Sequence, residues 1–148
     1  MGRLINPDSA GKERTRLTKT VALAVRELAK QAAPGAESRD LAAYIALSLD
    51  DIAGMIDVSV TAWEKRGYWV KADKFRMEWA WAGQTAEKMR AAVLTEDWAG
   101  VAQAAAQTAG RLNRITVPPG HRLGRPWVGA WKELHHQKAF GNSSFNHR

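Results

Sequence analysis

The chain has 148 residues, a length typical of one domain, and its 45% hydrophobic and 25% charged residues are typical of a folded globular protein. It contains no cysteine, which excludes a disulfide scaffold, a cysteine-ligated zinc site and a thiol nucleophile. Its 22 basic residues exceed its 15 acidic ones, giving a net charge of +7. The sequence has neither a signal-like apolar start nor an apolar run of about 20 residues, so we expect a cytoplasmic protein with no membrane role.

The first predicted helix follows a turn-rich leader, residues 1–11. From 12 to 33, apolar residues recur every three or four positions, which places them on one face of a helix. Pro34 cannot continue a helical hydrogen-bond ladder and Gly35 tolerates a turn. The pattern therefore predicts an amphipathic helix that ends before these two residues.

The second predicted helix covers residues 38–66, because its apolar positions keep one helical phase from Leu41 to Trp63. Residues 48–66 also resemble a DNA-reading helix-turn-helix, with a turn at 56–58. A turn at that point would break the apolar phase. We therefore favour one continuous helix and keep the helix-turn-helix as a weaker alternative.

The third predicted helix runs over residues 68–94 and has the most regular pattern of the chain. Its main apolar stripe consists of Tyr68, Ala72, Phe75, Trp79, Ala82, Ala86, Met89 and Val93. A second apolar set, Val70, Met77 and Trp81, lies on roughly the opposite side. Burial of large apolar side chains lowers the free energy of the folded protein. We therefore expect this second face to be covered by another helix, by the C-terminal tryptophans or by a second copy of the chain.

The fourth predicted helix covers residues 95–116, with Thr95 as its cap. Prolines and glycines make residues 117–126 extended, and a short amphipathic helix follows Pro126. We therefore predict an all-α fold, an up-down-up-down four-helix bundle over residues 1–116. An extended basic arm, residues 117–148, completes the same domain and ends in the short helix.

No constellation in the sequence indicates catalysis. All four histidines follow residue 116, outside the helices in which a bundle would hold a metal site. Neither a phosphate-binding loop nor a serine-nucleophile motif occurs. We therefore expect a non-enzymatic protein with no metal and no cofactor.

The arm carries much of the positive charge, with a net charge of +4 over residues 117–148. Basic residues beside aromatic ones are typical of proteins that bind single-stranded nucleic acid. The same tryptophans also fit helical packing, and we favour packing for them. The candidate partner-binding residues are the arm's Arg122, Arg125, Lys132, Lys138, Trp127 and Trp131, together with Val70, Met77 and Trp81.

These observations favour a non-catalytic binding or assembly protein whose partner is RNA or a ribonucleoprotein. The alternative is a protein-binding or self-assembling bundle whose charges only keep it in solution. In that case the second face of helix 68–94 would contact another protein or a second copy of the chain.

Overall fold

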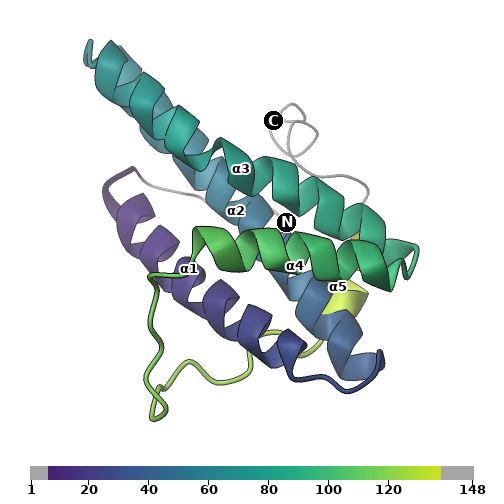
Figure 1. Cartoon of the computed structure of the whole chain (residues 1–148). Coiled ribbons are helices and arrows are strands. Elements are labelled where there is room, and N and C mark those ends of the chain that lie inside the picture. The colour runs from purple at the N-terminus through teal and green to yellow at the C-terminus, as the bar shows by residue number, and fades with distance from the viewer. Residues whose placement is uncertain (1–6, 138–148) are drawn as a thin grey trace.

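The computed structural model describes residues 7–137, and all regular secondary structure in this range is helical (Figure 1). The all-α prediction is therefore confirmed. The helices are α1 (Pro7–Ala29), α2 (Ala36–Lys65), α3 (Trp69–Leu94), α4 (Trp98–Arg111) and α5 (Ala130–His136).

The long helix α2 is the centre of the fold, because it packs against α1, α3 and α5. Its apolar stripe is fully buried and consists of Leu41, Ile45, Leu49, Ile52 and Met55. The helix is continuous from Ala36 to Lys65, as its unbroken apolar phase predicted. No turn separates two helices at positions 56–58, so the helix-turn-helix alternative is wrong.

Several helix boundaries differ from the prediction by a few residues, and the start of α1 and the cap of α4 differ for identifiable local reasons. Helix α1 begins at Pro7, inside the expected leader, because proline has the right φ for a first helical position and needs no donor there. Ala10 on this early turn is fully buried, which adds packing to the first turns of the helix.

The expected cap of the fourth helix is also wrong, because Asp97 caps α4 through its carboxylate, which accepts from the backbone N–H of Gly100 at 3.1 Å. Thr95 instead donates its hydroxyl back to the carbonyl of Ala91 at the end of α3. Helix α4 ends at Arg111, five residues earlier than predicted.

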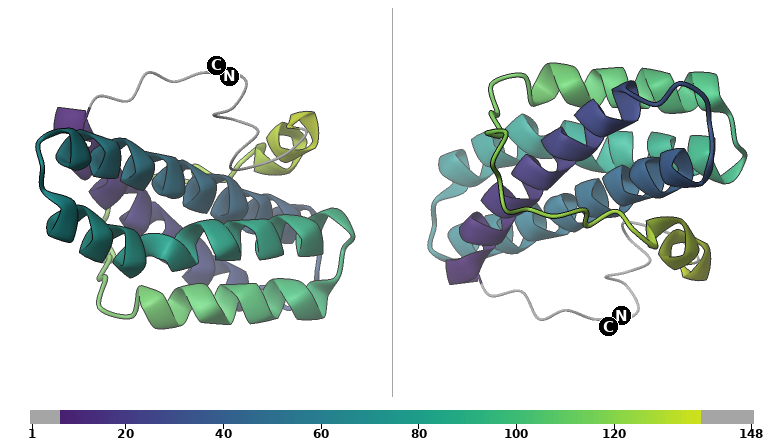
Figure 2. Two further views of the ribbon diagram at one scale, coloured as in Figure 1. Left: turned by 90° about the horizontal axis from the view of Figure 1, so that it is seen from above. Right: turned by 90° about the horizontal axis from the view of Figure 1, so that it is seen from below.

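The arm crosses α1 and then docks on the beginning of α2. Seen from below, the segment after α4 runs across α1 to α5 (Figure 2). The guanidinium of Arg26 on α1 donates to the backbone carbonyl of Ile115 and holds the segment that leads into the arm. At its other end the carboxylate of Asp40 accepts from the backbone N–H groups of Gly129 (3.2 Å) and Trp131 (2.9 Å). This carboxylate therefore caps α5.

Candidate binding surfaces

The arm's two tryptophans are packed against α2. The side chain of Trp127 is only 3% exposed, and its indole N–H donates to the carboxylate of Glu37 at 3.4 Å. Trp131 is half-buried, with the guanidinium of Arg39 5.9 Å from its ring centre and His135 against its edge. Of the three covers expected for the second face of α3, the C-terminal tryptophans are therefore excluded.

One of the arm's predicted binding cations is also engaged in the structure. Arg125 forms an ion pair with Glu37, and this contact holds the pKa of the Glu37 carboxyl below its usual range. A carboxylate with a lowered pKa stabilises the fold above its ordinary pKa and loses that effect as the pH falls, so the arm is held best near neutral pH. Arg122 and Lys132 are exposed and make no ion pair within residues 7–137, while Lys138 lies outside the described residues.

The second face of α3 is left uncovered by the rest of residues 7–137 at Val70 and Met77, and is partly covered at Trp81. Val70 is 69% exposed and Met77 is 73% exposed. Trp81 is half-buried, with Arg111 of α4 5.8 Å from its ring centre. The reason is length: α3 has 26 residues whereas α4, which packs beside it, has 14. Helix α4 therefore reaches only the C-terminal half of α3.

The connection between α2 and α3 projects beyond the other helices (Figure 1). We call this surface the hairpin tip and define it by Lys65, Arg66, Tyr68, Trp69, Val70, Lys71 and Lys74. All seven side chains are exposed. Gly67, at the turn itself, has a φ of +81°, a conformation that favours glycine.

The hairpin tip is positively charged because basic residues outnumber acidic ones around it, and one arginine engages both of the nearby carboxylates. Residues 63–77 contain five basic and two acidic residues. Arg76 binds both acids, Glu64 at 2.5 Å and Asp73 at 2.6 Å. Lys65, Arg66 and Lys74 consequently have no carboxylate partner within the described part of the chain.

Two aromatic side chains stand among these cations. Tyr68 is 53% exposed and Trp69 is 60% exposed. The sequence pattern placed Tyr68 in the buried stripe of α3, and that placement is wrong because the hairpin extends past α1 and α4. The signal that could have identified this site is the run of residues 65–71, in which basic residues flank a glycine and two aromatics.

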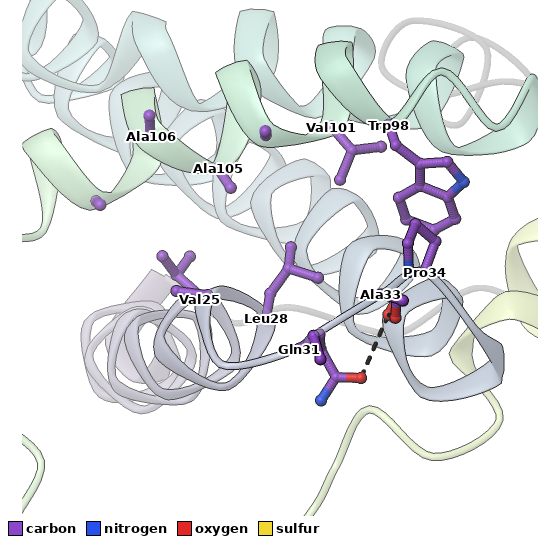
Figure 3. Close-up of a pocket in the computed structure, with 14 residues that line it drawn as sticks. Val25, Leu28, Gln31, Ala33, Pro34, Trp98, Val101, Ala105 and Ala106 are labelled. Atoms are coloured by element: carbon purple, nitrogen blue, oxygen red, sulfur yellow. Dashed lines mark hydrogen bonds between the residues drawn. The ribbon is translucent and has the colours of Figure 1, made fainter.

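A separate apolar groove lies between α1 and α4, with a volume of about 370 Å³ (Figure 3). Val25 and Leu28 line it from α1, and the small side chains of Ala105 and Ala106 line it from α4. Trp98 and Pro34 lie at one end of the groove in Figure 3. Because alanine is short, α4 does not fill the space toward α1, and an apolar surface stays open.

Neither a metal-binding cluster nor a membrane-spanning helix is found in the described range. Within residues 7–137, no three histidine, aspartate or glutamate side chains are grouped so that they could hold a metal ion. No helix of the same range has both the length and the apolar character needed to cross a bilayer.

Comparison with protein-family models, with curated proteins and with solved structures finds no match to this chain.

Proposed function

We propose that this protein is a non-catalytic RNA-binding module, built as a four-helix bundle whose hairpin tip holds the phosphate backbone. The observation that carries the proposal is the pairing of Arg76 with both local carboxylates, which leaves the cations of the hairpin tip without an acidic partner. Exposed lysine and arginine side chains release counterions when they neutralise phosphates, which supplies much of the affinity of proteins for nucleic acids.

Two observations favour the hairpin tip over the arm as the proposed contact. The two tryptophans of the arm pack on α2, and Arg125 is paired with Glu37. The tip cations, by contrast, lie on one projecting end of the molecule (Figure 1). A clustered positive surface attracts a polyanion more strongly than the same charges spread over the molecule.

Replacing Lys65, Arg66 and Lys74 together by glutamine tests this proposal. We expect weaker binding to a 20-nucleotide uridine-rich RNA, measured by fluorescence anisotropy between low and physiological salt. The slope of log affinity against log salt should flatten by about 2, because each lost phosphate contact to a single strand is worth about 0.7. The exposed positions of these side chains predict an unchanged melting temperature.

A matched control changes Lys19, Arg122 and Lys132 to glutamine, which removes the same charge from exposed residues elsewhere. We expect this control to retain the wild-type salt slope. If the control loses as much affinity as the tip variant, binding reflects net charge or the arm. If neither variant weakens binding, or the wild-type protein does not bind RNA, the proposal is wrong.

A second candidate function is self-assembly, and the exposure of Val70 and Met77 on α3 favours it. A second copy of the chain would bury both side chains and remove them from water. Sedimentation equilibrium at increasing concentration tests this candidate. A concentration-dependent dimer that Met77→Glu dissociates would support it, whereas a monomer at every concentration would exclude it.

A further inference from the structure

We infer that the hairpin tip is specific for single-stranded RNA, because Trp69 is a stacking platform for an unpaired base. This inference rests on the proposed function, since the tip cations must first hold the phosphate backbone. It adds the class of nucleic acid and the residue that selects it.

Trp69 differs from the other tryptophans of the chain in what lies over its ring. Five of them have a lysine or arginine within 6 Å of the ring centre, namely Trp63, Trp79, Trp81, Trp127 and Trp131. Trp98 is half-buried and lines the groove between α1 and α4. Among the described residues, no basic side chain lies over the ring of Trp69, which is 60% exposed.

The backbone that carries this indole is held in place before any ligand binds. The N–H of Tyr68 donates to the carbonyl of Trp63 at 2.9 Å, and the N–H of Gly67 donates to the carbonyl of Glu64 at 3.0 Å. Trp69 is the first residue of α3. Because this backbone is already ordered, binding has to immobilise only the side chain of Trp69. The conformational entropy lost is then smaller, and more of the stacking free energy contributes to affinity.

The arrangement of the tip fits a single strand rather than a duplex. Arg66 precedes the aromatic pair and Lys71 follows it, so cations flank the platform along the chain. Bases within a duplex are stacked on one another and cannot present a face to an indole, whereas an unpaired base can. Tyr68, beside Trp69, is 53% exposed and offers a second aromatic surface.

The test compares Trp69→Ala with Trp69→Phe on three probes: a 12-nucleotide oligouridylate, a 12-base-pair RNA duplex and inorganic polyphosphate. We expect Trp69→Ala to weaken oligouridylate binding about tenfold, because stacking of one base contributes on that scale. Affinity for polyphosphate, which has no bases, should stay within twofold of wild type. Trp69→Phe retains an aromatic face and should recover most of the lost affinity.

Val128→Ala is the matched control, since Val128 is 68% exposed, not aromatic and lies outside the hairpin tip. It should bind all three probes like the wild type, and all variants should melt at the wild-type temperature. Equal losses on oligouridylate and polyphosphate after Trp69→Ala, or no loss on oligouridylate, would overturn the stacking role. Those results leave the charge-based proposal standing, because the triple glutamine variant of the tip and its matched control test that proposal separately.

Discussion

Replacing Trp127 by alanine is expected to lower the free energy of unfolding by about 3–5 kcal/mol, the range for removing a large aromatic side chain from a packed position. The indole is 3% exposed, so its loss leaves a cavity between the arm and α2. The change also removes the N–H that donates to Glu37. Urea denaturation at neutral pH, followed by circular dichroism, measures the effect.

Trp127→Phe is the control, because it keeps a buried aromatic ring but loses the indole N–H and the smaller ring of the indole. We expect it to cost less than Trp127→Ala, about 1–2 kcal/mol, for the lost hydrogen bond and the smaller buried surface. RNA affinity of either variant, measured well below its melting temperature, should match the wild type. A Trp127→Ala variant that folds with wild-type stability but loses RNA binding would show that this indole stacks on bases instead of packing.

Replacing Ile52 by alanine is expected to cost about 2–5 kcal/mol, because its side chain is fully buried in the stripe of α2. The helix contacts α1, α3 and α5, so little backbone movement is available to close the resulting cavity. Thermal and urea unfolding of the two proteins under the same conditions give the difference.

Thr61→Ala is the matched control on the same helix, since Thr61 is exposed near the C-terminal end of α2. We expect its stability to stay within about 0.5 kcal/mol of wild type, as for most surface substitutions. A loss for Ile52→Ala no larger than that of Thr61→Ala would contradict the assignment of the core to this face of α2.

Helix periodicity was sufficient to predict the long helices, because a helix that buries one face has apolar residues at every third or fourth position along its sequence. The apolar phase of α2 from Leu41 to Trp63 predicted its continuity correctly. The same reasoning failed at the start of α3, where Tyr68 continues the repeat but is exposed. Periodicity shows which residues share a face and not whether a neighbouring helix is long enough to cover it.

The docking of the arm could not be derived from its own residues. The helical spacing of Trp127 and Trp131 predicts an apolar contact and favours packing of these side chains over stacking on bases. Their partner depends on Glu37 and Asp40, about 90 positions earlier in the chain, whose carboxylates accept from the arm. Nothing in local spacing distinguishes that contact from packing on α3. The hairpin tip was missed for a similar reason, since Arg76 pairs with Glu64 only when α2 and α3 lie side by side. Its other partner, Asp73, lies three residues earlier on α3 itself.

The most direct test of RNA binding at the hairpin tip is to locate the contact by cross-linking. Ultraviolet irradiation of the wild-type protein with a uridine-rich RNA, followed by trypsin digestion and mass spectrometry, identifies the peptide that carries the nucleotide. Cleavage after Arg66 and Lys71 releases the peptide 67–71, which contains both exposed aromatics of the tip. We expect the cross-linked nucleotide on this peptide. A cross-link on the peptide 123–132, which contains Trp127 and Trp131, or none on the peptide 67–71, would contradict the account.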